Sequence, residues 1–105
     1  FGSTYFTGQE TVYYQTTPIW GMSYAGGVSE DLPEEKAEPL FDFLRQALRN
    51  VHHEMPFRGP ESFERGIYRY SNRVLGNLSR FSGTETIFYQ EQSSYHLHYS
   101  GGLLR

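Results

Sequence analysis

The stretch that decides the fold is Phe6–Val28, with the sequence FTGQETVYYQTTPIWGMSYAGGV. It recurs 75 residues later, without a gap, as Phe81–Leu103, FSGTETIFYQEQSSYHLHYSGGL. Nine of the 23 aligned positions are identical, where composition alone gives roughly one or two. Self-similarity at a fixed spacing is typical of a duplicated structural unit. We therefore predict a single domain, residues 1–105, that contains two related copies, 6–28 and 81–103.

Alternation within each copy predicts a β-hairpin. Side chains on a strand point to opposite faces in turn, so residues two apart share a face. One face of the first copy carries Phe6, Gly8, Glu10, Val12 and Tyr14, followed after a turn at Thr16–Pro18 by Trp20, Met22, Tyr24 and Gly26. Six of the nine identities lie on this face. We expect it to be the face that packs inward.

The sequence between the copies predicts one main helix. Apolar residues recur at helical spacing from Leu40 to Val51, and Pro39 suits a first helical turn. The stretch Glu54–Gly66 holds two prolines and two glycines and is expected to be an ordered loop. Ile67–Ser71 reads as a further strand that leads into the second copy.

Together these elements predict an α+β fold. It is an antiparallel twisted sheet built from two duplicated three-stranded β-meanders, with the main helix packed on it. Residue 1 already corresponds to a point where the second unit has completed a helix and a strand. We therefore expect the first unit to lack its N-terminal helix and strand.

Composition excludes several classes of function. The chain has no cysteine, which rules out disulfides and favours a reducing compartment, so a cytoplasmic location is expected. A net charge of −3 does not favour nucleic-acid binding, which normally needs a basic excess. No apolar run approaches the roughly 18 residues of a membrane span, and the first residues of the sequence do not have the charged-then-apolar layout of a signal peptide, so we expect no membrane partner. The aromatic content is high, with nine Tyr, eight Phe and one Trp.

Three segments carry a resemblance to a known family: Ile19–Gly26, Glu54–Pro60 and Tyr99–Gly102. They resemble an uncharacterised bacterial domain family whose members look like stand-alone small proteins or partners of Xre-type helix-turn-helix regulators. The resemblance extends over essentially the whole chain. It implies a bacterial, regulatory context but brings no activity, cofactor or catalytic residue with it.

Glu10 and Glu85 are the leading site candidates, because they are equivalent in the two copies and lie on the face expected to be inward. A carboxylate aimed at a core must be paired, hydrogen-bonded or functional. If a pseudo-two-fold axis relates the copies, both acids approach a shared cleft that suits a cationic or aromatic ligand. Alternatively, each acid accepts hydrogen bonds from a Tyr, a backbone N–H or Arg58. The aromatic walls of the predicted cleft are Tyr14, Trp20, Tyr24, Tyr89, Tyr95 and Tyr99.

Two other chemistries are weaker. A paired-carboxylate hydrolase would use the same two acids, but acid and base need different environments, whereas duplicated sites begin alike. His96 and His98 share a strand face opposite Tyr95 and lack a nearby acid at a ligand spacing, so no metal site is predicted. We also predict no cofactor and no catalytic residue.

The leading expectation is therefore a non-enzymatic, effector-like ligand-binding or sensing module. The alternative is a protein-interaction or homodimerisation module, since a missing first strand would expose a sheet edge to strand addition. Phe57 and Arg58 form a candidate interaction loop, because loops on a rigid scaffold often carry recognition.

Overall fold

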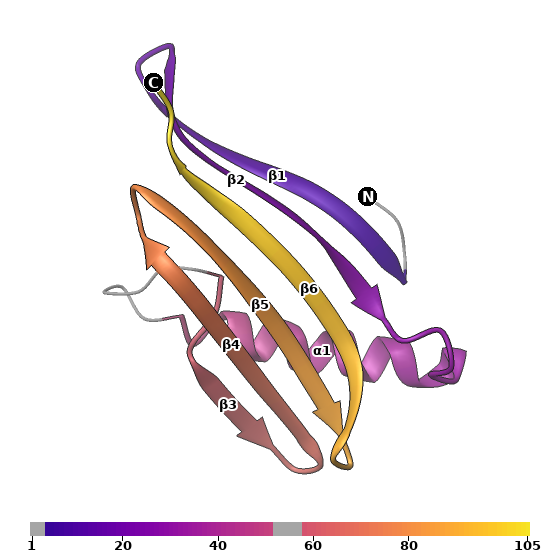
Figure 1. Ribbon diagram of the computed structural model, residues 1–105. Coiled ribbons are helices and arrows are strands. Elements are labelled where there is room, and N and C mark those ends of the chain that lie inside the picture. Colours follow the sequence, from indigo (N-terminus) through magenta and orange to yellow (C-terminus); the bar gives the residue numbers. More distant parts are fainter. Residues whose placement is uncertain (1–3, 52–57) are drawn as a thin grey trace.

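The computed structural model describes residues 4–51 and 58–105 (Figure 1). In these ranges the chain forms six strands and one helix. Their bounds are β1 Tyr5–Tyr14, β2 Thr17–Val28, α1 Glu34–Leu48, β3 Ser62–Arg65, β4 Tyr68–Asn77, β5 Arg80–Tyr89 and β6 Gln92–Leu103. All six strands join in one antiparallel sheet on which α1 packs, so the predicted α+β fold is confirmed. Within the described ranges, no helix has both the length and the apolar character that a membrane crossing requires.

The strand order is β1-β2-β6-β5-β4-β3, so the two predicted copies meet in the middle of the sheet, where β2 pairs with β6. In this pairing Tyr24 lies opposite Tyr99, its own equivalent in the second copy. A pseudo-two-fold axis therefore passes through the Tyr24–Tyr99 pair. β4, β5 and β6 form the predicted three-stranded meander of the second unit, and β1 and β2 form the hairpin of the first.

The β1–β2 and β5–β6 hairpins share their detailed geometry. Every partner pair of the first hairpin recurs in the second when both residues are shifted by 75 positions. The register shifts between Val12 and Tyr13, and again at the equivalent Ile87 and Phe88. Each hairpin turns through two residues, so the first turn is Gln15–Thr16 rather than Thr16–Pro18. These features are expected of repeated units, and the duplication itself stays a prediction.

The shared glycines have a packing role in both hairpins. A Cβ at Gly8 would lie 2.3 Å from the ring of Tyr24, and one at Gly83 would lie 2.2 Å from the ring of Tyr99. In each hairpin, then, a tyrosine ring lies directly over a glycine of the neighbouring strand. This close contact explains why both residue types recur at both places.

The helix begins earlier than the sequence indicated. It runs from Glu34, and Pro39 lies inside it rather than in its first turn. The prediction placed the start too late because proline interrupts the i to i−4 hydrogen bonds of a helix interior. Here Pro39 is on the exposed side, while the buried side carries most of the predicted apolar stripe, extended by two residues; its buried members are Ala37, Leu40, Phe43, Leu44 and Ala47. The predicted end at Val51 is wrong, because the helix ends at Leu48 and Val51 is exposed.

The segment predicted as the loop Glu54–Gly66 contains the short edge strand β3. β3 pairs with the first residues of β4, from Arg65 opposite Tyr68 to Ser62 opposite Ser71. Four residues between proline and glycine are too short for a clear alternation, so the local pattern could not indicate this strand. The first part of the predicted loop lies outside the described residues.

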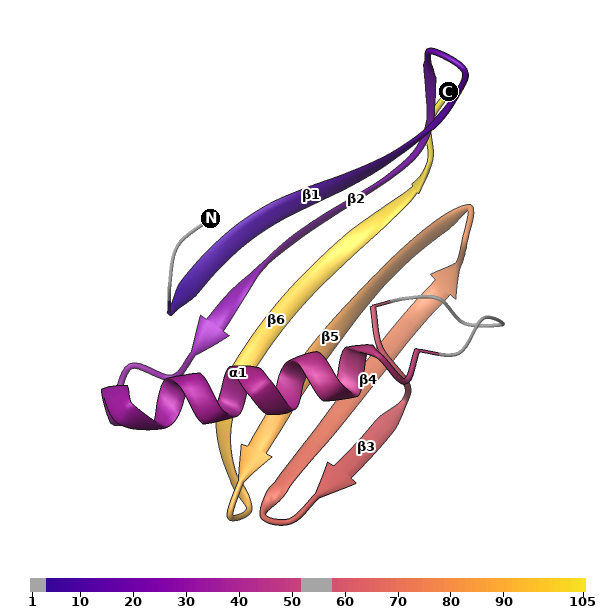
Figure 2. The ribbon, with the colours of Figure 1, turned by 180° about the vertical axis from the view of Figure 1, so that it is seen from behind.

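The predicted inward face is the one that α1 covers, but the cover reaches only one half of the sheet (Figure 2). Equivalent residues of the two copies therefore differ in burial. Ile87 is 0% exposed, whereas its counterpart Val12 is 47% exposed. On the opposite face of the sheet, none of the residues that the structure describes forms a helix (Figures 1 and 2).

Candidate functional site

The Glu85 carboxylate is the centre of a buried polar cluster under α1. Glu85 is 0% exposed, and both of its oxygens accept two hydrogen bonds. Oε2 accepts from Tyr70 Oη at 2.6 Å and from Arg58 Nε at 2.9 Å. Oε1 accepts from Tyr95 Oη at 3.1 Å and from Arg58 Nη2 at 3.2 Å. The carboxylate is thus fully satisfied by the protein, as a buried charge must be.

Arg58 supplies the cation of this cluster from the segment that follows α1. Its side chain is only 9% exposed, and its guanidinium carbon lies 4.9 Å from the centre of the Tyr24 ring. Its backbone adopts φ 68°, an uncommon conformation for a residue with a side chain. Burial opposes the charge of Arg58, but the hydrogen bonds and attraction to Glu85 prevail and raise its pKa.

The tyrosines around Glu85 are held in their neutral form. Burial, and then the adjacent carboxylate, raise the pKa of Tyr70 and of Tyr95 far above the usual tyrosine range. Both hydroxyls therefore act as hydrogen-bond donors to Glu85. The cluster is an ion pair enclosed by aromatic rings and saturated with donors.

A second buried chain of hydrogen bonds continues from this cluster. Tyr99 Oη donates to Asn72 Oδ1 at 2.6 Å, and Asn72 Nδ2 donates to the carbonyl of Gly59 at 3.1 Å. The backbone N–H of Asn72 donates to the carbonyl of Glu61 at 2.9 Å. Burial raises the pKa of Tyr99 to about 12, against the effect of its hydrogen bond to Asn72. The segment from Arg58 to Glu61 is consequently fixed to the sheet at three points.

The structure brings only part of the predicted site together. Tyr24, Tyr95 and Glu85 gather around Arg58, and Tyr99 belongs to the adjoining chain of hydrogen bonds. Sequence reasoning left out Tyr70 and Asn72, because their strand lies outside the repeated copies. It offered Arg58 both as part of an interaction loop and as a hydrogen-bond partner of the repeated acids, and Arg58 in fact pairs with the buried Glu85. Phe57, the other residue of that candidate loop, lies outside the described residues.

The remaining predicted site residues lie elsewhere. Glu10 and Tyr14 are exposed, since α1 does not reach the half of the sheet that carries them. Trp20 stacks on Phe81 at 5.6 Å and donates its indole N–H to the carbonyl of Leu78. Tyr89 packs beside Tyr68 at the opposite end of the sheet, with Lys36 over its ring.

The predicted shared cleft between Glu10 and Glu85 is wrong. Their strands are three positions apart in the sheet, about 14 Å at ordinary strand spacing. Across the sheet Glu10 aligns with Phe81, four residues from Glu85, which adds about 13 Å along the strands. The Cα atoms are therefore about 19 Å apart. A pair of hydrolytic carboxylates needs roughly 5 to 9.5 Å, so this arrangement does not support the hydrolase alternative.

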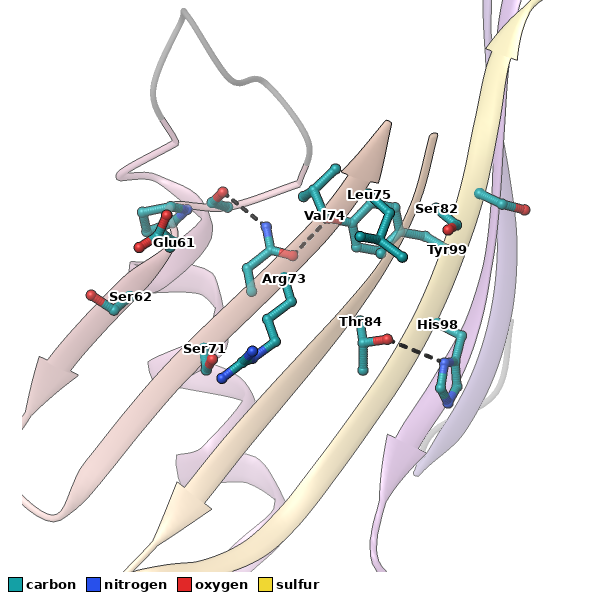
Figure 3. A pocket seen from close by; sticks show the side chains of 15 residues that line it. Glu61, Ser62, Ser71, Arg73, Val74, Leu75, Ser82, Thr84, His98 and Tyr99 are labelled. Atoms are coloured by element: carbon teal, nitrogen blue, oxygen red, sulfur yellow. Dashed lines mark hydrogen bonds between the residues drawn. The ribbon is translucent and has the colours of Figure 1, made fainter. Parts of the chain in front are cut away.

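The accessible feature next to the buried cluster is an open groove of about 1470 Å³ (Figure 3). It spans β4, β5 and β6 and extends to the segment 59–62, which forms one wall. Its open-face side chains come from neighbouring strands in cross-strand rows, with Arg73 opposite Thr84 and Thr84 opposite His98. Thr84 Oγ1 lies 3.5 Å from His98 Nδ1. The other residues of this face in the groove are Ser62, Ser71, Leu75, Ser82 and Ser100. The groove is also lined by residues whose side chains belong to the helix-covered face: Asn72, Val74, Gly83 and Tyr99.

Sequence reasoning placed His96 and His98 on the face opposite Tyr95, and the structure confirms that placement, because both His are exposed and Tyr95 is buried. It did not recognise a groove there. The signal in the sequence was the run of small hydroxyl residues on the open face of the second unit, which by itself resembles any solvated sheet face. In the described part of the chain no three His, Asp or Glu side chains gather closely enough to hold a metal ion.

Fold and groove together define an α+β protein with one helix-covered sheet face and one open polar face. The chain belongs to the family described as Domain of unknown function (DUF5680), whose family model matches residues 1–104. This agrees with the expected resemblance to an uncharacterised domain family. Neither the curated proteins nor the solved structures include a match to the chain.

Proposed function

We propose that this protein is a non-enzymatic small-molecule-binding module whose ligand sits in the groove on the open face of the sheet. The observation that carries the proposal is the groove itself, which runs over the open-face side chains of β4, β5 and β6 to the segment 59–61 at the sheet edge. Hydrogen bonds of the buried Asn72 fix that segment from the helix-covered side. A concave surface that is preformed suits a ligand, since little ordering is needed on binding. An effector-like role in the cytoplasm, in a bacterial regulatory context, is part of this proposal.

The Glu85 cluster then has a supporting role. A cationic ligand at Glu85, as the sequence suggested, would have to displace Arg58 from two hydrogen bonds and from the Tyr24 ring. The groove needs no such displacement. Arg58 and Glu85 instead hold the wall residues in place, because Arg58 directly precedes the wall segment 59–61 in the sequence.

A screen with a matched pair of variants tests the proposal. Thermal-shift hits from a metabolite library are followed by amide NMR, and we expect ligand-dependent shifts at Ser71, Thr84 and His98. Thr84→Trp fills the groove and should abolish these shifts. Gln9→Trp is the control, because Gln9 is the repeat equivalent of Thr84 but does not line the groove. Binding that survives Thr84→Trp, or a screen without hits, would overturn the proposal.

A second candidate is self-association through β1. β1 is an edge strand of ten residues that contains neither proline nor a basic residue, the usual protections of an exposed edge. Val28 donates its N–H to Thr4, so in β1 the even residues face β2 and the odd ones turn their backbone outward. A second copy of the chain adding β1 to β1 would satisfy these groups.

Light scattering on chromatographed protein tests this candidate. The native chain should be dimeric at high concentration, and Thr11→Pro should make it monomeric by removing an outward N–H. Thr11→Val keeps that N–H and should stay dimeric. A native chain that is monomeric at every concentration would exclude the edge as an interface.

A further inference from the structure

The groove contains an arginine, Arg73, that has no carboxylate partner among the described residues. Arg73 is exposed on the open face, and within residues 4–51 and 58–105 no carboxylate lies within 4 Å of its guanidinium. By contrast, Arg58 is paired with Glu85, and Arg69 lies over the Phe88 ring at 4.2 Å. Of the described residues that line the groove, one is an acid, Glu61, and it belongs to the wall beside β3 rather than to the row of Arg73 (Figure 3).

Two side chains that can donate hydrogen bonds, Thr84 and His98, lie on the next two strands across the sheet from Arg73. Figure 3 shows Arg73, Thr84 and His98 in succession on β4, β5 and β6. Arg73 and His98 are two strand spacings apart, about 10 Å between Cα atoms, with the short Thr84 side chain between them. In Figure 3 the guanidinium of Arg73 lies toward Ser71. The side chain is exposed, so it can turn toward Thr84 and His98 and close around a group that carries two to four oxygen atoms.

The open face is also where the two copies have diverged. His96 and His98 correspond to Gly21 and Ser23 in the first copy, whereas most identical residues lie on the covered face. The imidazoles are therefore confined to the half of the sheet that contains the groove. Packing does not explain them, because both side chains are exposed.

We propose, resting on the function proposed above, that the groove takes an anionic ligand, held through a carboxylate or a phosphate group by Arg73 together with Thr84 and His98. Guanidinium groups bind both kinds of oxyanion in the same forked geometry, and hydroxyl and imidazole donors complete the contact. A cationic ligand has no carboxylate to meet in this row. The Glu85 site, which has one, is already occupied by Arg58.

Amide NMR titrations at fixed ionic strength test the inference with four probes: inorganic phosphate, citrate, choline and glucose. We expect saturable shifts at Arg73, Thr84 and His98 with phosphate or with citrate, and the stronger of the two identifies the group. Arg73→Gln should weaken that binding at least about tenfold, the loss expected when a charge-assisted contact is removed. Arg105→Gln makes the same charge change outside the groove and should leave the affinity within about twofold.

The outcomes separate this inference from the proposed function. Saturable binding of choline or glucose in the groove, with no response to either anion, would overturn the anionic ligand and leave a binding module. Anion binding that is equally strong in Arg73→Gln would also overturn it. If no probe and no library compound shifts the groove amides, both proposals fail.

Discussion

At the scale of single residues, Glu10 and Glu85 occupy equivalent positions in the two copies but have different environments. Glu85 meets four donors under the helix, whereas Glu10 stands in water. The surrounding side chains, and not the residue type, therefore decide whether the carboxylate contributes to the stability of the fold. The network around Glu85 also fixes the groove wall, so its energetics are relevant to the proposed site.

Replacing each acid by glutamine measures this difference. Glu85→Gln leaves the Arg58 charge buried without its partner and should lower the free energy of unfolding by about 3 kcal/mol. Glu10→Gln changes an exposed side chain and should alter it by less than about 0.5 kcal/mol. Urea denaturation of both variants gives the comparison. Equal losses would contradict the separation described for the two acids.

The buried tyrosines predict a loss of stability in alkali. The native pKa values of Tyr70, Tyr95 and Tyr99 lie above the unfolded value near 10, with Tyr99 raised to about 12. Above pH 10 the unfolded chain therefore releases protons that the native chain retains. Stability is complete below pH 10 and should fall above it, by up to about 4 kcal/mol per pH unit for three tyrosines.

Tyrosinate absorbance recorded together with circular dichroism checks this pH dependence. The three buried tyrosines should ionise only when the β-sheet signal is lost. Complete ionisation near pH 10 with an intact sheet would contradict the buried network.

At the scale of elements, the start of α1 is the clearest departure from the sequence pattern. The helical period was visible only from Leu40, but Glu34 and Glu35 lie in the first turn, where acidic side chains favour the helix dipole. Packing of Ala37 and Leu40 on the sheet offsets the cost of the proline between them. Tertiary contacts, in other words, outweigh local propensity here.

Pro39→Ala tests this boundary. If the helix begins at Glu34, alanine restores an interior N–H and should raise the free energy of unfolding by about 1 kcal/mol. Glu38→Ala, at the exposed neighbouring position, should change it by less than about 0.5 kcal/mol. Thermal denaturation of the two variants is sufficient. A loss of stability in Pro39→Ala would indicate that the helix starts at the proline.

At the scale of the whole molecule, one helix covers one half of a sheet in which only the β1–β2 and β5–β6 hairpins match each other in strand pairing. The halves should therefore contribute unequally to stability. Ile87→Ala removes fully buried atoms and should cost about 3 kcal/mol, whereas Val12→Ala at the equivalent position should cost about 0.5 kcal/mol. Chemical denaturation of both variants measures this asymmetry, and similar losses would show that the two halves are equally covered.

Much of the architecture was predictable from residues 6–28 and 81–103, because hairpins depend on alternation and tight turns that are local in sequence. The helical stripe and the inward face followed from the same kind of pattern. The strand β3 was not predictable, since four residues show too little periodicity. Arg58 was one of the partners that the sequence offered for the repeated acids, but the sequence could not indicate which acid Arg58 meets. The positions of Tyr70 and Asn72 were not predictable, because they depend on contacts between segments 13 to 15 residues apart.

The sequence alone thus determined two matching hairpins, a helix between them and an aromatic-rich inner face, all of which arise from interactions between near neighbours in the chain. Tertiary structure alone decided that β2 pairs with β6, which half of the sheet the helix covers, and that Arg58 neutralises Glu85. It also decided that the groove forms on the open face. The physical reason is that burial and strand pairing depend on contacts between parts of the chain far apart in sequence. A local sequence pattern does not specify which of these distant surfaces pack together.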